Sequence, residues 1–121
     1  MADCAAMPSR SEGWGLVPRE AACTGLPVIV QRCSGIDDGH TDAWATVIDG
    51  GRMQEIPSHF DHIAGEWMIA NIDELATAMR WHYEHREHSA FLGRSAALWL
   101  RENQTWAHAS KALIDLITEY A

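Results

Sequence analysis

The sequence has little positive charge, few cysteines and no long hydrophobic run. Nine Lys and Arg residues stand against seventeen Asp and Glu residues, which gives a formal net charge of −8 with no cluster of Lys or Arg. Such a composition repels phosphate backbones, so a nucleic-acid-binding surface is not expected. With 121 residues and a 47% hydrophobic composition, the chain falls in the size range of one domain with a modest core.

Cysteines and apolar residues are also too sparse for several classes of protein. Cys4, Cys23 and Cys33 are odd in number and lack C-x-x-C spacing, so we expect neither a disulfide framework nor a zinc ribbon. The longest uncharged stretches, such as Ala21–Gln31, are shorter than the roughly 20 apolar residues of a membrane span. No basic region precedes an apolar run at the N-terminus, as it would in a signal peptide. We therefore expect a reducing, cytoplasmic compartment.

The first quarter of the chain has the pattern of a βαβ unit. Ala5–Met7 is short and apolar and ends at Pro8, which suits a buried strand. The segment Pro18–Gly25 has Pro at the expected first helical position and Gly just past the expected end, which predicts a short helix. Val28–Val30 is a β-branched run typical of a parallel strand that is covered on both faces. The order strand, loop, helix, strand predicts a βαβ unit.

The remainder of the chain is mostly loop and then helix. Between Ser34 and Gly51 only Trp44–Ile48 has the pattern of a strand, and Gln54–Met68 is ambiguous. Apolar side chains at helical spacing predict three helices after this region. They are expected over Asp73–His88, with Asn71 or Asp73 as the N-cap, over Ala90–Arg101, and over Thr105–Tyr120. The predicted fold class is therefore α/β, with a short parallel sheet followed by C-terminal helices.

The loop between the first strand and the first helix has the features of a ligand site. Gly13 and Gly15 remove side chains where a backbone approaches a partner closely or adopts positive φ. Leu16 and Val17 follow at the helix start, where unpaired N–H groups and the helix dipole favour a diphosphate. In an open α/β sheet this loop lies outside the carboxyl end of a strand, where ligands usually bind.

Two carboxylates, Glu12 and Glu20, flank this loop with seven residues between them. Carboxylates repel a phosphate, but they accept hydrogen bonds from sugar hydroxyls, which a nucleotide sugar offers at both ends of its diphosphate. The alternative is that Glu12 is a solvated loop residue and Glu20 an acidic residue that satisfies the helix dipole. Only Arg10 and Arg19 lie near enough in sequence to offer countercharge to a diphosphate.

The segment Ser11–Ala22, followed by Gly25–Ile29, resembles the E-x7-E signature of retaining glycosyltransferases of the GT-B fold, family 4. These proteins typically read P-S-x-x-E-G-F-G-L-x-x-x-E-A-M-A-x-G-x-P-V. Trp14 stands where Phe is common, and looser similarity continues through Ser34-Gly35. The matching residues are Pro8, Ser9, Glu12, Gly13, Gly15, Leu16, Glu20, Ala21, Gly25, Pro27 and Val28.

The resemblance implies a role for each site residue. Glu12 would contact the transferred hexose near its reacting centre, and Glu20 would hold the ribose hydroxyls of the nucleotide. Sugar hydroxyls and the distal phosphate would be held by the segment Gly13, Trp14, Gly15, Leu16 and Val17. Transfer would proceed with retention, with a nucleotide-diphosphate sugar as co-substrate and neither a metal nor another cofactor.

The resemblance also implies that residues 1–121 form the second half of a Rossmann-like GT-B C-terminal domain, a partial nucleotide-sugar-binding domain. The first half of the donor domain, with the basic pair that grips the diphosphate, and the domain for a glycan or lipid-linked acceptor would lie elsewhere. The chain alone is then expected to be inactive and to self-associate through an open sheet edge. Peripheral membrane association in a full-length enzyme stays open. The alternative is a non-catalytic nucleotide-sugar-binding or assembly module that retains the motif.

Histidines offer another interpretation of the chain. His82, His85 and His88 lie at i, i+3 and i+6 of an expected helix, and His59 and His62 form a second pair. A metal site needs its ligands on one face with supporting hydrogen bonds. His88 leaves the face that His82 and His85 share, so the sequence favours a solvated helix face over a metal site.

Tryptophan is abundant, with six residues. Trp81, Trp99 and Trp106 fit amphipathic helical spacing, and we expect them to anchor the core rather than to form a carbohydrate-stacking surface. Trp14 is the exception, because its loop position places it beside the expected donor.

Overall fold

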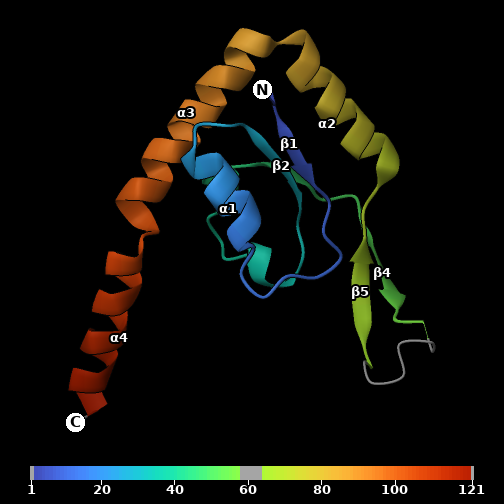
Figure 1. Cartoon of the computed structure of the whole chain (residues 1–121). Helices are drawn as coiled ribbons and strands as arrows, with labels where there is room; N and C mark the ends of the chain where they lie inside the picture. Colours follow the sequence, from blue (N-terminus) through green and yellow to red (C-terminus); the bar gives the residue numbers. More distant parts are fainter. Residues whose placement is uncertain (1, 58–63, 121) are drawn as a thin grey trace.

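The computed structural model describes residues 2–57 and 64–120. It has an α/β fold whose main sheet is parallel, with strand order β1-β2-β3 (Figure 1). These strands are β1 (Ala5–Met7), β2 (Val28–Gln31) and β3 (Thr46–Ile48). The predicted fold class, a short parallel sheet followed by C-terminal helices, is confirmed.

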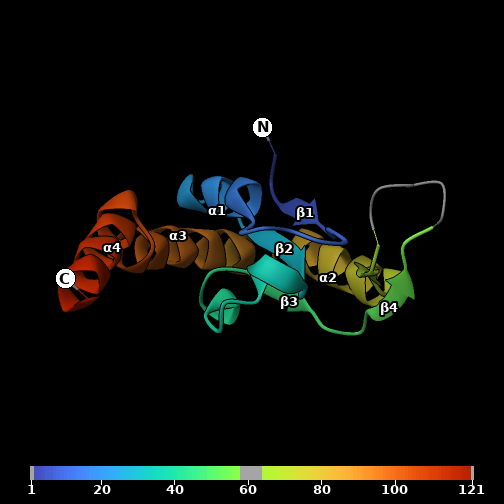
Figure 2. The same cartoon turned by 90° about the horizontal axis from the view of Figure 1, so that it is seen from below.

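Strand β2 lies at the centre of the core. All four of its residues are buried, as expected for a β-branched run with a strand on either side and helices packed against it. Helix α1 (Leu16–Cys23) packs against β1, β2 and α3 (Arg86–Asn103), and α2 (Ile72–Glu84) packs against β2, β3 and α3. In Figure 2, β1 lies on the same side as α1, β2 overlaps the line of α2 and α3, and β3 lies on the opposite side of that line from α1. The main core cluster comprises Ala22, Val28, Val30, Ile36, Trp44, Ala96 and Leu100.

Helix α1 starts two residues before the predicted position. Gly15, in the left-handed region at φ 73°, is its N-cap, and the helix begins at Leu16. Pro18 is therefore the third helical residue, where its missing N–H needs no intrahelical partner. Gly25 follows the helix end as predicted, with φ 87° and its N–H donated to the Ala22 carbonyl oxygen at 2.9 Å.

An antiparallel hairpin occupies the region in which the sequence pattern was ambiguous. It consists of β4 (Arg52–Glu55) and β5 (Glu66–Ile69) and forms a separate two-stranded sheet. Every residue of β4 is exposed, so the alternation of apolar and polar residues that identifies a half-buried strand is absent. The hairpin contacts the first loop, because the Met68 N–H donates to the Arg10 carbonyl oxygen at 2.9 Å.

Residues 32–45 connect the parallel strands β2 and β3. Two 3-10 helices, η1 (Ser34–Ile36) and η2 (Thr41–Ala43), lie between β2 and β3. The predicted strand at Trp44–Ile48 is shorter than expected and begins at Thr46, while Trp44 is 2% exposed and belongs to the core. Trp44 is thus the tryptophan that the core buries most deeply among those described.

The predicted helix at Asp73–His88 is two helices. Asn71 is the N-cap of α2, since its Oδ1 accepts from the N–H groups of Asp73 and Glu74. Helix α2 ends at Glu84, and α3 starts at Arg86, not at Ala90. His85 separates them with φ −117° and ψ 51°, and its ring Nδ1 lies 2.9 Å from the Trp81 carbonyl oxygen. The backbone N–H and the ring of His85 thus share the Trp81 carbonyl oxygen, and the regular backbone hydrogen bonds of α2 end there.

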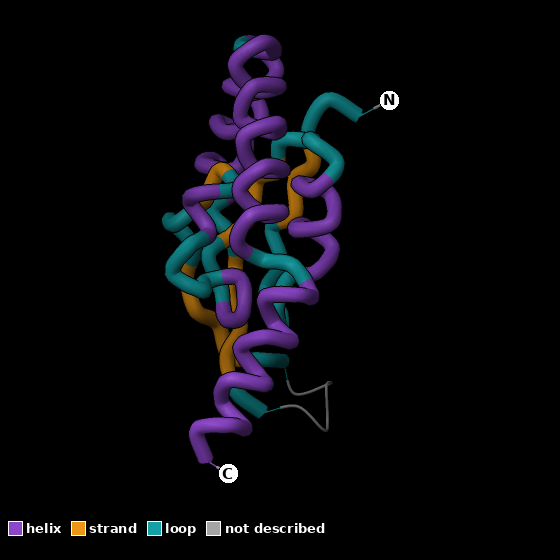
Figure 3. Tube along the Cα trace, turned by 90° about the vertical axis from the view of Figure 1, so that its left-hand side faces the viewer, coloured by secondary structure: helices purple, strands orange, loops and turns teal. Residues whose placement is uncertain are grey.

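Helix α4 (Trp106–Tyr120) extends away from the body of the molecule (Figures 1 and 3). None of its residues is buried, and Trp106 is 80% exposed. The prediction that Trp106 anchors the core is therefore wrong, whereas Trp99 packs against the core cluster as predicted and Trp81 is half-buried. Among the described residues, no helix combines the length and the apolar composition needed to cross a bilayer.

Candidate functional site

Two loops meet at the carboxyl edge of the parallel sheet. Residues 8–15 follow β1, and residues 32–38 follow β2. The Glu12 N–H donates to Ser34 Oγ at 2.8 Å, and the Glu12 carbonyl oxygen accepts from Ser34 Oγ and from the Gly35 N–H, both at 2.9 Å. The second loop therefore clamps the backbone of the first at Glu12. We call residues 8–15 the donor loop, after the sugar donor that is expected there from the sequence.

The two loops approach each other most closely at Gly35, a glycine other than the Gly13 and Gly15 that the sequence pointed to. A Cβ at Gly35 would overlap the Gly13 carbonyl group, so only glycine lets the two loops meet. Gly15 has the expected positive φ. A Cβ at Gly13, by contrast, would meet nothing within 4 Å, so the chain itself does not require glycine there.

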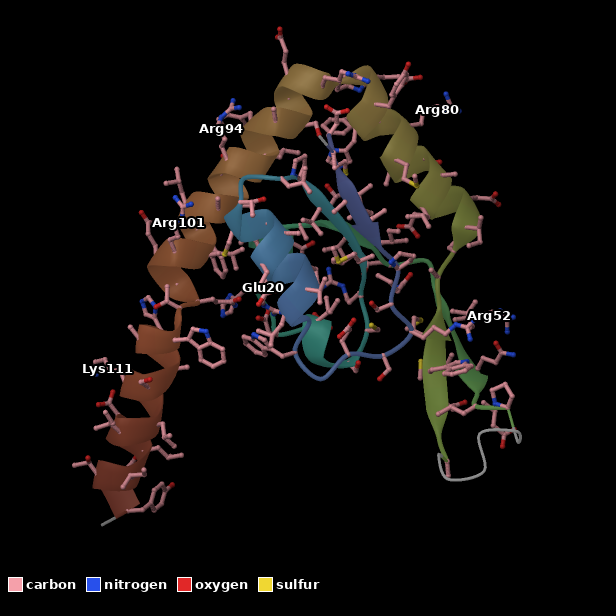
Figure 4. The ribbon with its side chains drawn as sticks, in the orientation of Figure 1. Glu20, Arg52, Arg80, Arg94, Arg101 and Lys111 are labelled. Atoms are coloured by element: carbon pink, nitrogen blue, oxygen red, sulfur yellow. The ribbon has the colours of Figure 1, made fainter. Side chains whose placement is uncertain are left out.

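The two glutamates of the motif differ in their surroundings. Glu12 is half-buried, and its Oε1 accepts a hydrogen bond from Ser9 Oγ at 2.7 Å. Glu20 is exposed on α1, where Figure 4 labels it. Among the residues that the structure describes, no side chain caps the N-terminus of α1, and Leu16 and Val17 are 46% and 65% exposed. The carboxylates of Glu12 and Glu20 thus lie near the start of α1, whose unpaired N–H groups can bind an anion.

The two basic residues that the sequence offered as countercharge both contact other side chains, although Arg10 is exposed. Arg19 is 4% exposed and forms an ion pair with Asp38 at 2.6 Å. The Arg10 guanidinium lies 4.5 Å from the centroid of the Trp67 ring. The positive charge available to a diphosphate is therefore smaller than the sequence indicated.

Asp38 is the acidic partner of this buried charge. Burial would raise the pKa of its carboxyl, but hydrogen bonds from the His40 N–H, Gln104 and Arg19 outweigh that effect and hold the pKa below its usual value. The neighbouring Arg32 is surrounded by three aspartates, Asp37, Asp42 and Asp49, at 2.5 to 3.0 Å. These networks fix the loop after β2, which in turn clamps the donor loop.

Of the three helical histidines that the sequence placed on a solvated face, His85 and His88 are exposed, whereas His82 is buried. His82 is 4% exposed, with Nε2 2.9 Å from Thr46 Oγ1 and Nδ1 2.7 Å from Ser89 Oγ. Burial lowers the pKa of His82. The ring lines a cavity of about 80 Å³ that also contacts Val28 and Thr46, at the amino ends of β2 and β3. His82 therefore has a packing role on the edge opposite the donor loop.

The other histidines are differently placed. His85 stacks on Trp81 with ring centroids 4.9 Å apart, while His59 and His62 lie outside the described residues. In the described segments, no group of three or more His, Cys, Asp or Glu side chains is arranged to hold a metal ion.

Sequence reasoning assigned no role to several residues that support the site. Ser9 and Ser34 orient Glu12, and Asp38 and Gln104 bind Arg19. Ser9 and the Ser34-Gly35 pair belong to the family resemblance, but only the structure shows that they hold Glu12. Gln104 could not have been found from the sequence, because nothing local distinguishes it from a solvated helix end.

Comparison with known families decides the class of protein. The family model described as "Family 4 Glycosyltransferase in conflict systems" matches residues 1–113. The chain belongs to this family. No curated protein matches it. As a family 4 glycosyltransferase, it carries its clamped loop and uncapped helix start at the edge where α/β proteins bind ligands.

Proposed function

We propose that this glycosyltransferase takes a hexose from a nucleotide-diphosphate sugar and transfers it to an acceptor with retention. The bond between the anomeric carbon and the diphosphate oxygen breaks, and an acceptor hydroxyl oxygen bonds to that carbon and passes its proton to the departing diphosphate. The proposal depends on one observation, the clamped loop that leads into an uncapped helix N-terminus at the carboxyl edge. The family membership supports the same class of reaction.

The donor loop and the start of α1 supply groups for each part of the donor. The Glu12 carboxylate accepts one hydrogen bond from Ser9 Oγ, which leaves acceptor positions for hydroxyls of the transferred hexose. The exposed Glu20 accepts from the ribose hydroxyls. The uncapped N–H groups of α1 stabilise the departing diphosphate in the manner of an oxyanion hole. The segment that holds the sugar and the distal phosphate is Gly13, Trp14, Gly15, Leu16 and Val17. Neither a metal nor another cofactor takes part.

The wider arrangement is also part of the proposal. The chain acts as part of the C-terminal donor domain of a GT-B enzyme in the cytoplasm, and a glycan or lipid-linked acceptor is held by a separate domain. By itself the chain does not transfer sugar. Within the described residues β1 pairs with β2 alone, and this open edge supports self-association of the isolated chain.

A second candidate is a non-catalytic module that binds nucleotide sugars. The specific observation in its favour is the small countercharge, because Arg19 is paired with Asp38 and Arg10 lies over Trp67. The departing diphosphate then has fewer stabilising partners than transfer requires. Assays with labelled nucleotide sugars and an acceptor panel separate the two functions: binding without transfer, even when an acceptor domain is added, would favour the module.

The assignment of Glu20 is tested by calorimetry with UDP, GDP and ADP. Glu20→Ala is expected to weaken binding of the preferred nucleotide by about 1.5–3 kcal/mol, the range for hydrogen bonds to charged groups. Glu102→Ala is the matched control, since Glu102 is also an exposed helical glutamate. Equal affinity in wild type and Glu20→Ala would remove the ribose role from Glu20.

The role of Glu12 is tested by turnover of the full-length enzyme, because the chain by itself is proposed not to transfer sugar. Glu12→Gln keeps the size and one acceptor oxygen but loses the charge, so the rate of sugar transfer should fall while nucleotide affinity stays nearly constant. Equal losses of both would place Glu12 on the nucleotide instead of the hexose.

A further inference from the structure

We propose that Arg19 is a positioning residue, which sets the geometry of the donor loop, and that Asp38 and Gln104 hold its guanidinium in place. Only the identity of the ligand that the donor loop binds rests on the proposed function. The role of Arg19 in holding the loop rests on contacts within the chain.

The first step is the contact between Arg19 and the end of the donor loop. Its Nη1 donates to the Trp14 carbonyl oxygen and lies 3.4 Å from the Gly15 carbonyl oxygen. These are the last two carbonyls before α1, at the left-handed Gly15. A Cβ on Gly15 would lie 3.1 Å from Arg19 Nη1 and 2.9 Å from Ile36 Cγ1. The loop therefore turns directly against the guanidinium.

The second step is a closed ring of hydrogen bonds around the same guanidinium. Arg19 Nη2 pairs with Asp38 Oδ2 at 2.6 Å, and Arg19 Nε donates to Gln104 Oε1 at 3.0 Å. Gln104 Nε2 closes the ring by donating to Asp38 Oδ2 at 2.8 Å. The three residues come from α1, the loop after β2 and the end of α3. Because a buried charge is tolerated only when its partners are satisfied, each member depends on the other two.

The third step is the stacking of the guanidinium between two indoles. Arg19 Cζ lies 4.1 Å from the centroid of the Trp14 ring and 4.7 Å from that of the Trp44 ring. Trp44 is 2% exposed and belongs to the core, whereas Trp14 is 46% exposed on the donor loop. Arg19 thus connects a fixed ring to a loop ring. Trp14 keeps an exposed surface beside the proposed donor.

The alternative role of Arg19, direct binding of the diphosphate, does not fit these contacts. Its side chain is 5% exposed, and its three nitrogens are directed to Trp14, Asp38 and Gln104. The residue acts on the donor through the loop.

The experiment measures backbone amide exchange by NMR in the full chain. Gln104→Ala removes one side of the ring at a half-buried position, so the core stays intact. The amides of Glu12, Arg19 and Gly35 are hydrogen-bonded at the loop. They should exchange at least about tenfold faster in the variant, because it loses the two hydrogen bonds that Gln104 makes to charged groups. The amides of β2 should be unchanged. Faster exchange everywhere would indicate general destabilisation and overturn the proposal, as would unchanged loop amides.

Arg101→Ala is the matched control. Arg101 also connects α3 to α1, since its Nη2 donates to the Cys23 carbonyl oxygen at 3.2 Å, but it does so at the C-terminal end of α1. Figure 4 labels Arg101 on α3 and Glu20 on α1. The control should alter amides near Cys23 and leave the donor loop unaffected. A loop response equal to that of Gln104→Ala would contradict a specific role of the ring.

A double-mutant comparison tests whether Gln104 acts through Arg19. If it does, Gln104→Ala changes nothing further in an Arg19→Gln background. Additive effects on the loop amides would show independent action and reject the proposed chain of contacts. Should Arg19→Gln unfold the chain, the single variant Gln104→Ala still decides, because its expected result concerns the loop alone.

Titration with UDP, GDP and ADP separates this inference from the proposed function. Nucleotide should shift the loop amides of the wild type, and Gln104→Ala should need about tenfold more nucleotide for the same shift. If the wild type does not respond to any nucleotide, the proposed function fails, while the exchange result still decides the positioning role. A wild-type response that Gln104→Ala reproduces at equal concentration would overturn that role.

Discussion

The donor loop and helix α4 differ in how the chain uses its side chains. In the donor loop, polar groups far apart in sequence satisfy one another, as Glu12 does with Ser34 and Arg19 with Asp38. In α4, apolar side chains at helical spacing remain exposed, among them Leu113 and Ile117 at 57% and 60%. The loop is therefore fixed by the rest of the chain, whereas the conformation of α4 depends on its own sequence. The comparison indicates that substitutions in the two regions change the free energy of unfolding by very different amounts.

The largest contrast is expected between two leucines. Leu100, at 1% exposed, belongs to the core cluster, and Leu100→Ala should lower the free energy of unfolding by about 2–5 kcal/mol. Leu113→Ala in α4 should change it by less than about 0.5 kcal/mol. Urea denaturation followed by circular dichroism measures both. A cost for Leu113→Ala close to that of Leu100→Ala would mean that α4 is buried in solution and would end the comparison.

The next largest effect concerns Asp38, whose pKa is lowered in the folded state. Such a carboxylate contributes stability above its unfolded pKa of about 3.9, and this contribution is lost as the pH falls through the lower folded value. Asp38→Asn should cost about 1.5–3 kcal/mol at pH 7 through loss of hydrogen bonds to a charge. The melting temperatures of the wild type and of Asp38→Asn, measured from pH 7 to pH 2, should become equal at the acid end. A difference in melting temperature that stays constant over this pH range would show that the Asp38 carboxylate is not the cause of it.

Local patterns predicted the βαβ unit and the αL glycine, because a β-branched run and a glycine before a helix act through their own backbone. They did not predict the hairpin, whose strand β4 is exposed. The contacts that hold the donor loop join residues 22, 19 and 85 positions apart, as in Glu12–Ser34, Arg19–Asp38 and Arg19–Gln104. Such pairings depend on the folded topology, which single-sequence periodicity does not contain.

A smaller effect is expected where the two loops meet. Gly35→Ala places a Cβ against the Gly13 carbonyl group, and overpacking of this kind costs about 1–3 kcal/mol. Gly13→Ala serves as the control, because its Cβ meets nothing within 4 Å, and it should change the free energy of unfolding by less than about 0.5 kcal/mol. Chemical denaturation distinguishes them. Equal free energies of unfolding for Gly35→Ala and Gly13→Ala would mean that the two loops can move apart without loss of stability. The loop after β2 would then not hold the donor loop.

The smallest effect concerns His82, on the edge opposite the donor loop, whose pKa is lowered by burial. Because the unfolded chain takes up a proton first, near pH 6.5, stability falls as the pH drops from there toward the lower folded value. One proton limits the slope to about 1.4 kcal/mol per pH unit. His82→Gln keeps groups for Thr46 and Ser89 but does not titrate, so its stability curve between pH 7.5 and 5.5 should be flatter. A wild-type slope that survives in His82→Gln would assign the titration to another histidine and leave His82 with packing alone.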